Sequence, residues 1–266
     1  MSRTYTTNAV VLRRAPFGDH GALLTLLTPT EGKVPAIVRG LKRPASYLAG
    51  HLEPLALVTV GIARGRNLDV ITQAQLCQVF PHLREDVYRV AVGWCAAEII
   101  DYLLDQRQES CQTYNLFLAL LRQLNTAANP DILLGFFEMR LLTILGYRPV
   151  LWQCAMCSSP NQEIEGHFAA AQGGWICKAC AVTVSSSHRL SLPALNLLRC
   201  FQVGYLADLD RQEVPQPVLS EAMQTLNELV QMIAERTPRT LSLLNRIRSQ
   251  RTSLLPGAQP EKLTSL

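Results

Sequence analysis

The sequence lacks any hydrophobic run long enough to cross a membrane as a helix, which requires about 20 consecutive apolar residues. It also lacks the apolar stretch of a secretory signal peptide, because residues 1–8 are mostly polar. We therefore expect a cytoplasmic protein. Charged residues make up only 17% of the 266 residues and hydrophobic residues 48%. This balance favours a sizeable core and excludes extensive disorder.

The motifs of common catalytic sites are missing as well. The sequence has no Gly-rich loop followed by Lys-Ser/Thr, no H-E-x-x-H and no G-x-S-x-G. We therefore predict that the protein is not an enzyme. Glu98, Asp101 and Asp105 follow one another at three- and four-residue spacing. This spacing predicts one helix face, which is either solvated or meets a basic partner.

The first 80 residues have the pattern of short β-strands. Turn residues at Glu31-Gly32 and at Gly65-Arg66-Asn67 separate runs of apolar and β-branched residues. These runs are Thr6–Arg14, Ala22–Thr28, Lys33–Arg39, Leu55–Arg64 and Leu68–Phe80. Five strands in so short a segment predict a small barrel, either an OB-fold or an SH3-like barrel, and periodicity does not separate the two. We expect a bulge at Gly61 and an edge or bulge at Pro35.

The rest of the chain has mainly helical periodicity, interrupted once. Hydrophobic residues recur at helical spacing over residues 85–104, 114–124 and 131–145, and again over 192–206, 217–236 and 238–250. Asn129-Pro130 and Ser191 predict helix starts, and Gly146 predicts a helix end. We therefore expect a barrel domain over 1–80, a helical domain in two parts over 81–150 and 189–252, and a flexible tail over 253–266.

The interruption, residues 151–188, contains four of the eight cysteines as two C-x-x-C pairs. Cys154 and Cys157 form one pair, and Cys177 and Cys180 form the other, with 19 residues between them. Two such turns can close a tetrahedral shell of four thiolates around one structural Zn²⁺ ion per chain. A redox pair is the alternative, but it usually begins a helix in a thioredoxin-like unit, and none is visible. The remaining four cysteines are interpreted as small buried hydrophobic residues: Cys77, Cys95, Cys111 and Cys200.

Basic residues are concentrated in the N-terminal third. Residues 1–80 hold nine Lys and Arg against four Asp and Glu. A positive groove on a small barrel can follow the phosphates of a nucleic acid. We therefore predict DNA contacts at Lys33, Arg39, Lys42 and Arg43, with Arg13 and Arg66 as further candidates.

Three motifs in one order carry a family resemblance. They are the stretch from Gly18 to Lys33 continued by Val38–Lys42, the stretch from Phe137 to Pro149, and the two C-x-x-C pairs. Together they resemble the RecO family of recombination mediators over nearly the whole chain. The resemblance implies an α+β multidomain protein. It would have an N-terminal five-stranded OB-fold β-barrel, then an α-helical domain with an inserted zinc finger of four cysteines.

The resemblance also implies a function in DNA repair. Such proteins bind single- and double-stranded DNA, anneal complementary strands and, with RecR, help to load RecA on DNA coated by single-stranded-DNA-binding protein (SSB). They work at the nucleoid and make no chemical bond. Phe136 and Arg140 are candidates for binding the SSB tail, whose terminal carboxylate suits an arginine. The alternative is a zinc-stabilised scaffold that binds proteins without binding DNA directly.

Overall fold

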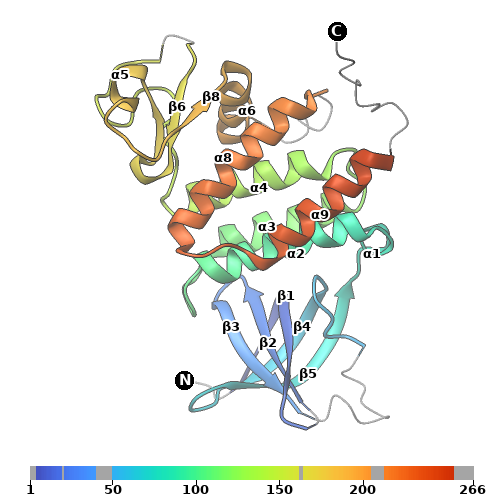
Figure 1. The fold of residues 1–266 in the computed structure, drawn as a ribbon. Coiled ribbons are helices and arrows are strands. Elements are labelled where there is room, and N and C mark those ends of the chain that lie inside the picture. The colour runs from blue at the N-terminus through green and yellow to red at the C-terminus, as the bar shows by residue number, and fades with distance from the viewer. Residues whose placement is uncertain (1–3, 20, 40–49, 162–163, 205–212, 255–266) are drawn as a thin grey trace.

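A five-stranded barrel forms the N-terminal end of the molecule in the computed structural model, which describes residues 4–19, 21–39, 50–161, 164–204 and 213–254. Figure 1 shows the barrel at one end, a body of helices in the middle and a small cysteine-rich module at the far end. The barrel strands are β1 (Thr4–Phe17), β2 (Gly21–Thr28), β3 (Gly32–Val38), β4 (Leu57–Ala63) and β5 (Asp69–Gln78).

The order of the strands around the barrel is β1-β2-β3-β5-β4, and β4 closes on β1. Neighbouring strands are antiparallel except β3 and β5, which are parallel and pair only at Ala36↔Asp69 and Ile37↔Val70. This closed Greek-key arrangement confirms the OB-fold over the SH3-like alternative.

Local irregularities let so small a sheet close. The register of β1 shifts between Val11 and Arg13, so that its first half pairs with β4 and its second half with β2. A second shift lies between Gly61 and Ile62 of β4, which confirms the predicted bulge. Pro35 pairs with β2, and pairing with β5 begins one residue later. The proline therefore lies outside the β3–β5 ladder, where its missing N–H would break a hydrogen bond.

After the barrel, the chain forms helices both before and after the cysteine-rich module. α4 and α6 begin, and α4 ends, where the sequence predicts caps. The Asn129 side chain accepts hydrogen bonds from two backbone N–H groups in the first turn of α4. The Ser191 side chain accepts one from a backbone N–H group in the first turn of α6. Gly146, with φ of 87°, follows the end of α4. The helices are α1 (Pro81–Glu85), α2 (Val87–Leu103), α3 (Cys111–Leu124), α4 (Pro130–Ile144), α6 (Leu192–Val203), α8 (Gln216–Ala234) and α9 (Arg239–Leu254).

Two hydrophobic cores stabilise the structure. One fills the barrel, with Leu24, Val34 and Ile62 fully buried. The other runs through the helices and the module, and it includes Val10 and Leu27 of the barrel, which pack against the helical body. Helices from opposite sides of the module pack together, α9 on α2 and both α6 and α8 on α4. The chain therefore returns to one helical body after the module, as Figure 1 also shows.

The cysteine-rich module is a small three-stranded sheet with one helical turn. Strands β6 (Gly166–Ala169) and β7 (Gly174–Ile176) form a hairpin, joined by the 3-10 turn η1 (Ala170–Gln172). A third strand, β8 (His188–Leu190), pairs with β6 and was not predicted, because three residues are too few to show alternation. The helical turn α5 (Lys178–Ala181) follows β7.

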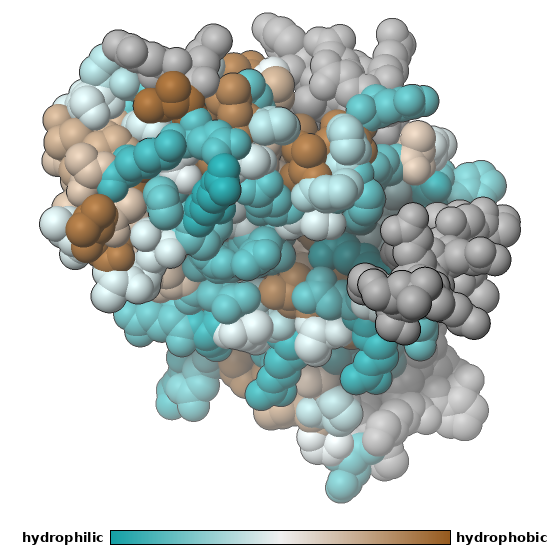
Figure 2. Space-filling model, turned by 45° about the horizontal axis from the view of Figure 1, so that its top comes forward, coloured by the Kyte–Doolittle hydropathy of each residue, from teal (hydrophilic) through white to brown (hydrophobic). Residues whose placement is uncertain are grey.

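On the face shown in Figure 2, hydrophobic side chains lie in small patches. These patches are separated by hydrophilic residues, and several gather toward the upper left, the end that carries the module. Exposed hydrophobic residues of the module include Met156, Ile164 and Val182. Among the described residues, no helix is both long and apolar enough to span a bilayer.

Candidate metal centre and nucleic-acid interface

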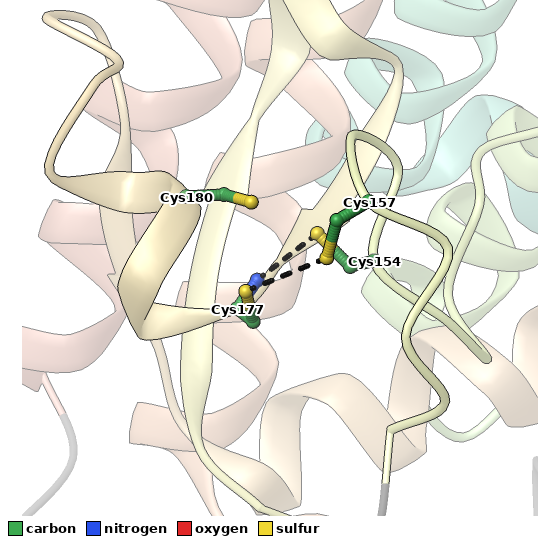
Figure 3. Close-up of side chains that lie close together, drawn as sticks. All are labelled: Cys154, Cys157, Cys177 and Cys180. Atoms are coloured by element: carbon green, nitrogen blue, oxygen red, sulfur yellow. Dashed lines mark hydrogen bonds between the residues drawn. The ribbon is translucent and has the colours of Figure 1, made fainter.

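The four paired cysteines meet at one point of the module. Their Sγ atoms all lie within 4.8 Å of one another, and the Sγ atoms of Cys157 and Cys177 are 3.9 Å apart. Figure 3 shows the two pairs facing each other, Cys154 and Cys157 from a loop, and Cys177 and Cys180 from the start of α5. Such a cluster can hold a metal ion, and four sulfur ligands would leave no position open for water.

Hydrogen bonds support two of the four sulfurs, those of Cys154 and Cys157. The backbone N–H of Cys177 donates to Cys154 Sγ at 3.4 Å, and the hydroxyl of Ser159 lies 3.1 Å from Cys157 Sγ. Burial raises the pKa of Cys154, but several hydrogen bonds, first among them those from the backbone N–H groups of Cys157, Cys177 and Met156, together lower it to about 6. The Cys154 thiol is therefore readily ionised, and the thiolate is the form that binds metal.

The cysteines outside this cluster correct one prediction. Cys95 is buried in the core as expected. The expectation that Cys77, Cys111 and Cys200 are buried as well is wrong, because all three are exposed on the surface. Each stands on a strand or helix with one face toward solvent, and the apolar neighbours in sequence face the core instead.

The predicted DNA-contact residues do not form one cluster in the described structure. Arg39, at the end of β3, and Arg66, in the β4–β5 hairpin, are exposed and have no ionic partner among the described residues. Arg13 is 59% exposed and lies 3.6 Å from Asp101 of α2. Lys42 and Arg43 lie outside the described residues. Two of the six predicted residues thus offer open cationic groups.

Lys33 is placed differently from the rest of that set. Its side chain is only 10% exposed, its Nζ lies 3.3 Å from the carboxylate of Asp101, and it donates to the backbone carbonyl of the same residue. The ammonium group therefore joins the barrel to α2 and does not face solvent. Of the three acidic residues expected on one helix face, two have partners within the chain: Asp101 pairs with Lys33, and Glu98 accepts from the backbone N–H of Thr240. The third, Asp105, is exposed.

We expect Lys33→Met to destabilise the protein by about 1–3 kcal/mol, because the substitution leaves a half-buried carboxylate with one weak partner. The affinity for a short oligo-dT that contacts only the barrel should stay unchanged, because the Lys33 ammonium group does not face solvent. Urea unfolding and a DNA-binding titration measure the two effects separately. Arg66→Met is the matched control, since it removes an exposed cation and should leave stability within about 0.5 kcal/mol. Parental stability with weakened DNA binding in Lys33→Met would contradict this assignment.

Phe136 and Arg140 lie together on α4. The Arg140 guanidinium stacks on the Phe136 ring at 4.9 Å, and its Nη2 donates to the carbonyl of Gly204 at 2.6 Å. Arg140 Nε is buried and has no hydrogen-bond partner among the described residues. The guanidinium thus keeps an unused donor beside an aromatic ring.

A closed OB-fold barrel, joined to a helical body with a four-cysteine centre, defines the class of this protein. Residues 1–80 match the family model described as Recombination protein O N terminal, and residues 84–250 match Recombination protein O C terminal. Neither description names a catalytic activity. The chain therefore belongs to the RecO family of DNA repair proteins.

Similar proteins cover nearly the full length of the chain. A DNA repair protein RecO of Roseiflexus sp. (strain RS-1) is 34% identical over 96% of this chain and 90% of its own. The RecO proteins of Symbiobacterium thermophilum and of Dehalococcoides mccartyi (strain BAV1) are 32% and 28% identical, over 93% and 92% of this chain. They cover 99% and 96% of their own lengths, so the similarity includes barrel, helices and module alike.

Proposed function

We propose that this protein is a recombination mediator that binds single- and double-stranded DNA and anneals complementary strands. With RecR, it would help to load RecA on DNA coated by SSB. The observation that carries the proposal is the closed OB-fold barrel with open cations at Arg39 and Arg66, within a chain of the RecO family. Barrels of this type bind single strands through cationic surfaces and loops.

The barrel is the proposed DNA interface. Arg39 is followed directly by residues 40–49, which carry Lys42 and Arg43. Arg66 stands at the tip of a hairpin, a position from which a long side chain reaches a phosphate. Lys33 is not included in this interface, because its ammonium group is buried against Asp101.

The four-cysteine centre is the proposed site of one structural Zn²⁺ ion. Four cysteine sulfurs, of which Cys154 and Cys157 accept from backbone N–H groups, suit zinc, which accepts four-coordinate sulfur sites without redox chemistry. Zinc would add cross-links to a module whose sheet has only short strands. The proposed role is to hold residues 151–188 in place between the two parts of the helical domain.

Arg140 with Phe136 is the proposed contact for the SSB tail. A half-buried guanidinium beside an aromatic ring suits a chain end that combines a carboxylate with apolar side chains.

We expect Arg39→Ala/Arg66→Ala to bind oligo-dT more weakly than the parent protein. The slope of log affinity against log salt concentration should decrease by about 1.4, because each lost phosphate contact on a single strand contributes about 0.7. Fluorescence anisotropy at four salt concentrations measures both quantities. Arg122→Ala/Arg246→Ala, which removes two exposed arginines of α3 and α9, is the charge-matched control.

A parent protein with no affinity for DNA at low salt would contradict the proposed function and would favour the protein-only scaffold. The mediator activity itself is tested by annealing complementary strands coated with SSB, with and without RecR. The parent protein should accelerate annealing, and Arg39→Ala/Arg66→Ala should lose most of that acceleration.

A further inference from the structure

A continuous groove follows the junction between the barrel and the helical body. Three hollows of about 440, 580 and 180 Å³ adjoin there. The first two share Arg14 and Pro54, and the last two share Pro54 and Trp94. We call this feature the junction groove. On the barrel side, its walls are residues 12–16 of β1 and residues 53–55. On the helical side, they are residues of α1 and α2 and the segment from Arg236 to Thr240, which leads into α9.

The charge of the junction groove is positive. It is lined by five arginines, Arg13, Arg14, Arg84, Arg236 and Arg239, and by the three acidic residues Glu53, Glu98 and Asp101. Each acidic residue already has a partner within the chain. Glu53 pairs with Arg14 at 2.5 Å, Asp101 pairs with Lys33, and Glu98 accepts hydrogen bonds from Thr240 and Tyr102.

Three of these arginines are open to an outside anion. Arg84, Arg236 and Arg239 are exposed and have no carboxylate partner among the described residues. They stand at the two ends of the α2 side of the groove, on either side of Trp94. Cations distributed along a track suit a ligand whose negative charges repeat along its length.

Aromatic rings lie between these cations. Trp94 is 42% exposed although its neighbours on α2 are buried. Tyr102 holds its hydroxyl on Glu98 at 2.6 Å, and the Arg236 guanidinium stacks over its ring at 3.9 Å. Flat groups with one open face are the platforms on which unpaired bases stack.

The groove also leads to the proposed DNA interface of the barrel. Its first hollow is lined by Gly21 and Ala22 at the start of β2. Ala22 pairs with Val38, and Arg39 follows Val38 directly. A strand that contacts Arg39 can therefore continue past Arg14 to Trp94 without leaving the surface.

We propose that the junction groove binds single-stranded DNA as an extension of the barrel interface, with phosphates on Arg84, Arg236 and Arg239 and bases on Trp94. This inference rests on the proposed function. A duplex would present no base faces to Trp94, so the groove should select single strands. An acidic peptide could also use the arginines, but it would have no need of a track that continues to Arg39.

Fluorescence of Trp94 tests the stacking directly. The chain has three tryptophans, and Trp175 is buried. In a Trp152→Phe protein, adding oligo-dT should quench the exposed Trp94, and this quenching should disappear in Trp94→Phe/Trp152→Phe. Trp94→Ala should weaken oligo-dT binding about tenfold. Trp152→Ala, which removes the other exposed tryptophan, should leave the affinity unchanged.

Salt dependence tests the phosphate contacts. Arg236→Gln/Arg239→Gln should lower the salt slope for a long oligo-dT by about 1.4. A short oligo-dT that fills only the barrel should show the parental slope. Arg122→Gln/Arg246→Gln, on exposed faces of α3 and α9, is the charge-matched control. Circular dichroism of each variant verifies that it is folded.

The outcomes separate this inference from the proposed function. If Arg39→Ala/Arg66→Ala weakens binding but the Trp94 and Arg236/Arg239 variants bind as the parent does, the groove does not carry DNA and the barrel proposal stands. If the parent protein binds no DNA, both fail. A peptide with the acidic SSB tail that loses affinity in Trp94→Ala, while oligo-dT binding is unaffected, would assign the groove to a protein partner and overturn the inference.

Discussion

Purified protein is expected to carry about one zinc ion per chain, and Cys154→Ser to lose it together with the structure of the module. Cys154 is fully buried, and its sulfur accepts from the backbone of Cys177, so it links the two C-x-x-C pairs. Free energies of metal binding in such sites are about 10–16 kcal/mol, most of which supports folding. Loss of the ion should therefore unfold residues 151–188 under conditions where the barrel remains folded.

Metal analysis and the emission of Trp175 measure the two parts of this prediction. Trp175 lies in β7, is 1% exposed and stands two residues before Cys177. Its emission should shift to longer wavelength when the module opens, in Cys154→Ser and in the parent protein treated with a chelator. Cys200→Ser, an exposed cysteine of α6, should keep both the metal and the parental emission. A stable module without any metal would refute the proposal of a structural zinc site.

Replacing Glu138 by Gln is expected to stabilise the protein at neutral pH and to remove part of its pH dependence. Glu138 lies on α4, is fully buried, and neither carboxylate oxygen has a hydrogen-bond partner among the described residues. Burial raises the pKa of Glu138 to about 8, the nearby Arg248 lowers it in part, and Asp131 raises it. The folded protein therefore holds this carboxyl in its neutral form at pH 7.

The sign of the effect follows from proton binding. Between the ordinary pKa of Glu, about 4.3, and about 8, the folded state keeps the proton and the unfolded state has lost it. The free energy of unfolding of the parent should then decrease by about 1.4 kcal/mol per pH unit from this group alone. Glutamine does not titrate. From pH 5.5 to 7.5, the free energy of unfolding of Glu138→Gln relative to that of the parent should therefore increase by about 1.4 kcal/mol per pH unit.

Urea unfolding at pH 5.5, 6.5 and 7.5 gives the difference between the two proteins at each pH. The comparison cancels the titration of every other group that the two proteins share. Glu109→Gln, in an exposed segment before α3, is the matched control and should follow the parent at all three pH values. A constant difference between Glu138→Gln and the parent would show that Glu138 is ionised in the folded state.

The sequence predicts the individual strands and helices of this fold better than it predicts which strands pair to close the barrel. Alternation and turn residues locate the five barrel strands, and cap residues such as Asn129 and Ser191 locate helix starts. The OB-fold itself depends on the pairing of β3 with β5, which joins residues more than 30 positions apart over only two residue pairs. No local pattern determines such a contact, so periodicity leaves the two barrel types open.

The same limit applies to the candidate sites. The spacing of Cys154, Cys157, Cys177 and Cys180 predicts their cluster, because each pair is fixed by a local turn. Charge patterning groups Lys33 with Arg39, although one is buried and the other exposed. The difference arises from Asp101, 68 residues away, which takes the Lys33 ammonium group. The junction groove is missed for the same reason, because β1, α2 and the start of α9 are distant in sequence.

The packing of α9 on α2 affects how the chain folds as it leaves the ribosome. Glu98 of α2 holds the first turn of α9 through Thr240, 142 residues later, and Asp131 of α4 binds Arg248, 117 residues later. The barrel and the first four helices are synthesised long before these partners emerge, and the face of α2 that receives α9 stays uncovered until then. A nascent or truncated chain that ends after the cysteine module would thus leave this face of α2 open to solvent, and only the synthesis of α9 would cover it.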